Sequence, residues 1–267
     1  MTDKPKTQGK AKPFLQGSPA DENTLRQALK FFGAMLLVGF MCFLVCSMTS
    51  FDSAVLRIGI NLVIESLVLL IFFNRGTTLG TDGVARGEIL YQHVQKGQEV
   101  SENEKKIPYH RLKGFLIGFI GTALFFILAL ILAFTAQRQM TGAGTLPSWL
   151  ESYMRRSEFS GALVSYTRNV SVTAQDIIRI VVRILIMPFV SMAGAENRNL
   201  LLIAERMSPL LVLLPALSYG IGYLQGPAQR KKIHTEIAAN ARKRKIREKR
   251  EKRKRNTSAP KGPQQLN

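Results

Sequence analysis

Four apolar segments, each close to the length of a membrane span, constrain this chain more than any other feature. The hydrocarbon core of a bilayer is roughly 30 Å thick, so a helix rising about 1.5 Å per residue needs about 20 apolar residues to cross it. The segments are 31–49, 54–73, 114–136 and 209–224. The first and third contain no charged residue, and only the fourth is short. We therefore predict an all-α, polytopic integral membrane protein with four transmembrane helices.

Composition alone would hide this pattern. A hydrophobic content of 46% and a mean hydropathy of +0.06 are typical of a soluble protein, but here the apolar residues are concentrated in a few runs. This segregation excludes an ordinary soluble enzyme, a disulfide scaffold and a disordered chain. Cys42 and Cys46 both lie in the first apolar segment, where we expect them to behave as small hydrophobic residues. The three histidines are scattered and no catalytic motif is present, so we predict no metal, no cofactor and no enzymatic activity.

A fifth segment, 176–195, is apolar but contains Arg179 and Arg183 one helical turn apart, and Pro188. An arginine near the centre of a span costs about 2.5–3.5 kcal/mol on insertion scales. We predict an external amphipathic or re-entrant helix, with both arginines facing the headgroups. The alternative is a fifth span whose arginines pair inside the helix bundle.

The distribution of basic residues favours four spans over five. Residues 230–267 contain 15 Lys and Arg against 3 Asp and Glu, and such a tail is expected to stay in the cytoplasm. With four spans, 28 of the 37 basic residues lie inside. A fifth span would export the basic N-terminal arm. We expect a multi-pass protein of the cell membrane with both termini cytoplasmic, and the predicted segments follow in chain order. They are a basic arm (1–30), a transmembrane hairpin (31–73), a cytoplasmic loop (74–113), a span (114–136), an external region (137–208), a span (209–224) and a basic, helical or disordered cytoplasmic tail (225–267).

A polar stripe within the second span is the best intramembrane candidate for a functional site. Arg57, Asn61 and Glu65 are spaced four residues apart and therefore share one helix face. Polar groups are costly in hydrocarbon, so this face must contact other helices or water. Glu65 lies near the middle of the span, where its carboxylate could take up a proton, bind a cation or pair with Arg179 or Arg183. The alternative is a purely structural ion pair.

The tail is the second candidate. We expect a helix to emerge from the last span, and we expect its basic residues to bind a polyanionic surface. These residues are Arg230, Lys231, Lys232, Arg242, Lys243, Arg244, Lys245, Lys252, Arg253, Lys254 and Arg255. Anionic lipid headgroups are the nearest partner, and RNA or the ribosome is the other. Anchoring the topology of the chain is the simpler role.

Small residues indicate close helix packing. Gly114 and Gly118, and Ser218, Gly222 and Gly226, are spaced four apart, which permits close backbone approach. This packing can occur within the chain, by self-association or in a membrane complex.

These features predict a non-enzymatic membrane scaffold or accessory subunit that presents its loop and polybasic tail to cytoplasmic partners. Two alternatives remain. In its basic tail, its loop 74–113 and its intramembrane Arg57, the chain resembles in architecture the YidC/Oxa membrane-protein insertases, which implies a tail near the ribosome. The stripe with Glu65 also fits a small transporter or channel subunit.

Overall fold

The computed structural model describes residues 12–48, 53–136, 173–194 and 197–258, with side chains to Lys252. Throughout these residues the regular structure is α-helical, which confirms the predicted class, and four helices are long and apolar enough to cross a membrane. These four are α1 (Glu22–Met48), α2 (Ala54–Gln95), α4 (Lys113–Thr135) and α9 (Arg198–Leu224). The remaining helices are α3 (Glu102–Lys106), α7 (Ala174–Leu185), α8 (Met187–Ala193) and α10 (Gly226–Ser258).

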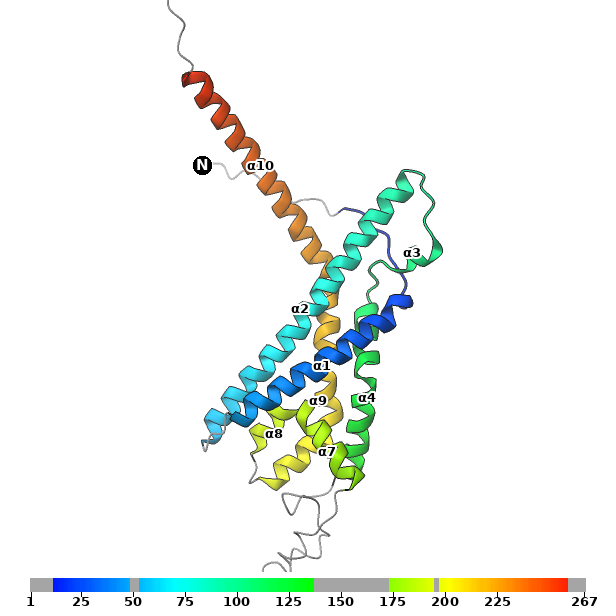
Figure 1. The fold of residues 1–267 in the computed structure, drawn as a ribbon, viewed down its shortest axis with the longest axis vertical. Coiled ribbons are helices and arrows are strands. Elements are labelled where there is room, and N and C mark those ends of the chain that lie inside the picture. Colours follow the sequence, from blue (N-terminus) through cyan, green and yellow to red (C-terminus); the bar gives the residue numbers. More distant parts are fainter. Residues whose placement is uncertain (1–11, 49–52, 137–172, 195–196, 259–267) are drawn as a thin grey trace, which may run out of the picture.

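The four long helices form a bundle in which α9 packs between α4 and α2, and α1 packs against α4 (Figure 1). Helix α10 follows α9 after a single residue and projects away from the bundle (Figure 1). We call the end of the bundle from which α10 leaves the tail end, and the opposite end, where α1 leads into α2, the far end. The core is made of apolar side chains from α1, α2, α4, α7 and α9, with Ile117, Ala129 and Leu132 fully buried.

Helix α2 is twice as long as its apolar part. The first part of the predicted loop 74–113 is instead helical, and α2 runs without a break to Gln95. Two glycines in this part allow close packing. A Cβ at Gly76 would collide with the carbonyl oxygen of Tyr219, and one at Gly80 would collide with that of Tyr223. Because α9 crosses α2 backbone to backbone here, the glycines are required by the neighbouring helix and not by a turn.

The small-residue steps in α4 and α9 pack within the chain. Gly114 faces the ring of Tyr223, and Gly118 lies against Ala216. Gly222 approaches the carbonyl of Phe73 on α2. All three positions are thus occupied by neighbouring helices of the same molecule.

Helix α9 also begins earlier than predicted. Pro209, expected at the start of the helix, lies inside it, and the N-cap is Asn197, whose side chain accepts a hydrogen bond from the backbone of Leu200. A proline cannot donate to the carbonyl four residues before it. The hydroxyl of Ser208 replaces that bond by donating to the carbonyl of Glu205 at 2.6 Å, so the helix continues through Pro209.

At the tail end, the N-terminal segment and the α2–α4 connection pack together. The amide of Leu15 donates to the carbonyl of Gly87, and that of Gly17 donates to Tyr109. Tyr109 in turn donates to Gly83 of α2. The segment preceding α1, the extension of α2, the connection 96–112 and the base of α10 therefore meet at one end of the molecule.

Candidate functional site

The predicted polar stripe on α2 joins three helices through Asn61, which is 1% exposed. The amide nitrogen of Asn61 donates to the carbonyl of Arg57 at 2.7 Å and to the hydroxyl of Ser191 on α8 at 3.1 Å. Its oxygen accepts from the thiol of Cys46 on α1 at 3.3 Å. Asn61 thus fastens α2 to both neighbours, as a structural contact would.

The two charged members of the stripe lie apart from each other. The guanidinium of Arg57 packs over Gly194, where a Cβ would come within 2.7 Å of it, and Gly194 has the positive φ of 76° that favours glycine. Glu65 is half-buried beside Cys42 and Pro188, and lines a cavity of about 20 Å³. Such a space is sufficient for about one water molecule.

The two arginines of the fifth segment point into the bundle, so the prediction that both face headgroups is wrong. Within 176–195 the chain forms α7 and α8, separated at Ile186, and Arg179 is 3% exposed. Its Nε lies 2.9 Å from Oε1 of Glu205 on α9, and Nη2 of Arg183 lies 2.6 Å from the same oxygen. Glu65, whose pairing with these arginines was one of the alternatives considered above, is not the residue that binds them. A buried carboxylate makes it possible for the arginine face of α7 to turn inward.

Asp176 completes this cluster at the start of α7. It forms a capping box with Thr173, and its Oδ1 lies 3.4 Å from Nη1 of Arg179. The hydrogen bonds from Thr173 and the charge of Arg179 hold the pKa of the Asp176 carboxyl below its ordinary value. Sequence reasoning missed Glu205, although it is the sole acidic residue of α9.

At the tail end, Glu88 holds α10 against α2. The carboxylate of Glu88 accepts from Nη2 and Nε of Arg230 at 2.9 and 3.0 Å, and from Nε2 of His234 at 2.8 Å. Glu88 lies 15 residues beyond the apolar part of α2 that ends at Phe73. Burial by itself would raise the pKa of Glu88, but the hydrogen bonds and charges of Arg230 and His234 outweigh it and lower the pKa. We call these three residues the α10 clamp.

The other predicted tail residues contact little. Arg230 belongs to the clamp, whereas the remaining basic residues with described side chains are exposed. These are Lys231, Lys232, Arg242, Lys243, Arg244, Lys245 and Lys252. The side chains of Arg253, Lys254 and Arg255 lie outside the described residues.

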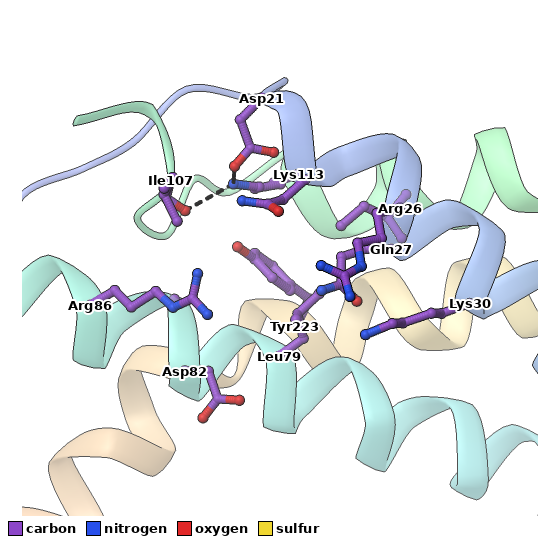
Figure 2. A pocket seen from close by; sticks show the side chains of 13 residues that line it. Asp21, Arg26, Gln27, Lys30, Leu79, Asp82, Arg86, Ile107, Lys113 and Tyr223 are labelled. Atoms are coloured by element: carbon purple, nitrogen blue, oxygen red, sulfur yellow. Dashed lines mark hydrogen bonds and ion pairs between the residues drawn. The ribbon is translucent and has the colours of Figure 1, made fainter. Parts of the chain in front are cut away.

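A basic groove between α1 and α2 is a further site that sequence reasoning missed. Near the tail end it holds a space of about 250 Å³, in which Arg26 and Lys30 of α1 and Arg86 of α2 surround the ring of Tyr223 (Figure 2). The amino group of Lys113 is buried at its edge and is bound to Asp21 at 2.7 Å and to the carbonyl of Ile107 at 2.9 Å. Lys113 and Asp21 thus neutralise each other, whereas Arg26, Lys30 and Arg86 have no ion-pair partner among the described residues.

The groove continues along α1 and α2 toward the far end. A second space of about 670 Å³ shares Lys30 and Asp82 with the first, and is lined by Arg75 and by the apolar residues Phe31, Ala34 and Leu37 among others. No signal in the sequence pairs α1 with α2 in this way, because the basic residues are separated by more than 40 positions. Within the described ranges, no group of three or more His, Cys, Asp or Glu comes together as a metal site. The basic residues that line the groove are suited to bind anions.

The chain matches no protein family, no curated protein and no solved structure in comparisons with each.

Proposed function

We propose that the protein is a four-span integral protein of the cell membrane with both termini in the cytoplasm. Two observations support this proposal. Four helices have the required length and hydropathy, and the N-terminal segment, the α2–α4 connection and α10 lie at one end of the bundle (Figure 1). That end carries most of the basic residues, which is the pattern expected of a cytoplasmic side.

Topology can be tested by thiol labelling in sealed cells. In a background in which Cys42 and Cys46 are replaced by serine, single cysteines are placed at Ser101 and Ser157. Ser101 lies in the α2–α4 connection, and Ser157 lies outside the described residues. An impermeant reagent should label position 157 from outside and should label position 101 only after lysis. Labelling of position 101 in intact cells would contradict the proposal and favour five spans.

We further propose that the protein is a non-enzymatic scaffold that presents a polybasic helix to a polyanionic partner in the cytoplasm. The α10 clamp carries this proposal. Because Glu88 binds Arg230 and His234, the base of α10 is fixed on α2, and the basic residues beyond it are held away from the bundle (Figure 1). A helix fixed at its base presents its charges in one direction at a lower entropic cost than a free chain.

The outer part of α10 favours a partner that is large and densely charged. All residues from 239 to 252 are exposed, and all but four of them are charged. The uncharged ones are Ala239, Asn240, Ala241 and Ile246. An amphipathic helix that lies on a membrane needs one apolar face, which this stretch lacks. RNA, including ribosomal RNA, offers the required charge in the aqueous phase.

Binding can be measured with the full-length protein in nanodiscs of zwitterionic lipid. RNA should bind with little sequence preference and should dissociate as salt increases, because exposed charges are screened over about 8 Å at physiological ionic strength. Replacing residues 242–245 with glutamine should weaken binding strongly. As a control with the same change in charge, the exposed loop residues Lys96, Lys105, Lys106 and Arg111 are replaced with glutamine.

Equal loss in both variants would show that net charge, and not α10, binds the RNA, and would contradict the proposal. Co-sedimentation of intact ribosomes with the nanodiscs, lost in the 242–245 variant, would favour the insertase alternative. Preference for one RNA by orders of magnitude would contradict recognition by charge alone.

A further inference from the structure

The basic groove exists because α1 and α2 pack on different partners. Helix α1 lies on α4 and α7, while α2 lies on α9. The two helices are close near the connection between them and diverge toward the tail end (Figure 1). The diverging faces leave the two adjoining spaces of about 250 and 670 Å³, and the larger one is within the usual size range of ligand pockets.

The walls of this groove are divided by polarity. At the tail end the lining is cationic, with Arg26, Lys30, Arg75 and Arg86 opposed only by Asp82, since Asp21 is already bound to Lys113. Farther along α1 the lining is apolar. A ligand that uses both parts must join an anionic group to a hydrocarbon chain.

The cationic part lies at the expected depth of lipid headgroups. Lys30 directly precedes the uncharged stretch 31–48 of α1, and Arg75 directly follows the uncharged stretch 66–74 of α2. Both residues therefore mark the boundary between the apolar and polar zones of the bundle. Figure 2 shows Lys30 and Arg86 extending from opposite helices toward the same space. Two cationic side chains that face one space are suited to bind a phosphate.

We propose that this groove binds one anionic phospholipid. Its phosphate and acidic headgroup lie among Arg26, Lys30 and Arg86, and one acyl chain lies along Phe31, Ala34 and Leu37. A free phosphate would use the cationic part alone and would leave the apolar part unoccupied. The inference rests on the proposed membrane insertion, and it is independent of the proposed role of α10.

The first test uses delipidated full-length protein in detergent, with the basic runs 242–245 and 252–255 replaced by glutamine to reduce the contribution of the tail. Phosphatidylglycerol should raise the midpoint of thermal unfolding in a saturable manner, because a ligand of the folded state stabilises it by mass action. Phosphatidylcholine with the same acyl chains, and inorganic phosphate at the same concentration, should not. An equal shift with phosphate would identify a site for a soluble anion, and an equal shift with phosphatidylcholine would identify an acyl-chain site. Either result would overturn the proposal.

Charge variants locate the binding site. In the double variant Lys30→Gln/Arg86→Gln, the affinity for phosphatidylglycerol should fall by about 30-fold, as expected for the loss of two basic contacts to an anionic headgroup. The matched control, Lys96→Gln/Lys106→Gln, removes two exposed charges from the loop and should keep its affinity. Equal loss in both variants, or no loss in either, would overturn the proposal.

A photo-crosslinking residue at Leu37 then identifies the occupant in cells. Because Leu37 is 62% exposed, bulk lipid can react as well. Enrichment of anionic over zwitterionic phospholipid in the adduct, lost in Lys30→Gln/Arg86→Gln, supports the inference, whereas an adduct with a polypeptide would overturn it and assign the groove to a protein segment. If the chain fails to fractionate with membranes, the proposed topology fails as well. If it fractionates and labels as proposed but shows no enrichment of anionic lipid in the adduct, the groove inference alone fails.

Discussion

Replacing Glu205 with glutamine should strongly destabilise the protein. The side chain of Glu205 is 2% exposed, and its Oε1 lies 2.9 Å from Nε of Arg179 and 2.6 Å from Nη2 of Arg183. Glutamine keeps the shape of the side chain but removes its charge. Both guanidiniums would then lose the charge of Glu205, and Arg179 would keep its ion pair with Asp176, at 3.4 Å.

The size of the effect follows from burial. Removing one partner of a buried ion pair costs about 3–5 kcal/mol, because the remaining charge is left uncompensated away from water. The matched control is Glu248→Gln on α10. Glu248 is paired with Arg244 at 3.4 Å, but the side chains are 58% and 85% exposed. Such exposed helix pairs contribute about 0.3–0.5 kcal/mol, so this variant should resemble the wild type.

Thermal unfolding of the purified protein in detergent measures both variants. We expect a decrease of several degrees in the midpoint for Glu205→Gln and almost none for Glu248→Gln. A third variant, in which Arg179, Arg183 and Glu205 are all replaced by apolar residues of similar volume, should recover most of the stability, since a well-packed apolar cluster often equals a buried ion pair. If Glu205→Gln unfolds at the wild-type temperature, the reasoning about this cluster is refuted.

Three further predictions concern packing and the α10 clamp. Gly222→Ala should destabilise the bundle by about 1–3 kcal/mol, because its Cβ would meet the backbone of Phe73, whereas Gly59→Ala, with nothing within 4 Å, should be neutral or stabilising by about 0.5–1 kcal/mol; equal unfolding midpoints would contradict the close contact. Asn61→Leu should lower the unfolding midpoint, because the variant loses the hydrogen bonds to Cys46 and Ser191. Each bond of the average strength found in membranes contributes about 0.6 kcal/mol to stability. The control is Ser66→Ala, whose hydroxyl donates only within its own helix. Because the pKa of Glu88 in the folded protein is below its ordinary value of 4.5, the clamp contributes stability above that pH and loses it as pH falls through the lowered pKa. Distances between spin labels on α2 and α10 should therefore stay narrow from pH 7 to pH 5 and broaden only in more acidic solution, and broadening at pH 6 would refute this account.

The apolar pattern by itself determined that the described chain is helical and contains four helices of spanning length. Each of these properties depends on runs of about 20 residues, and a run of this kind is visible without knowledge of its neighbours. The spacing of Gly114 and Gly118, and of Gly222 and Gly226, likewise indicated where backbones approach. Membership of a helix face is a local property, so sequence was sufficient for it.

The partners of these faces were decided by the tertiary structure. The glycines at 76–83 resemble a turn in sequence, and only the crossing of α9 explains why a helix tolerates them. Arg179 and Arg183 were expected to face headgroups, because the sequence does not reveal that Glu205, 22 residues after Arg183, folds back beside them. The basic groove is likewise absent from any local pattern. Lys30 and Arg86 share it only because α1 and α2 pack on different neighbours and diverge, and divergence is a property of the whole bundle and not of either helix.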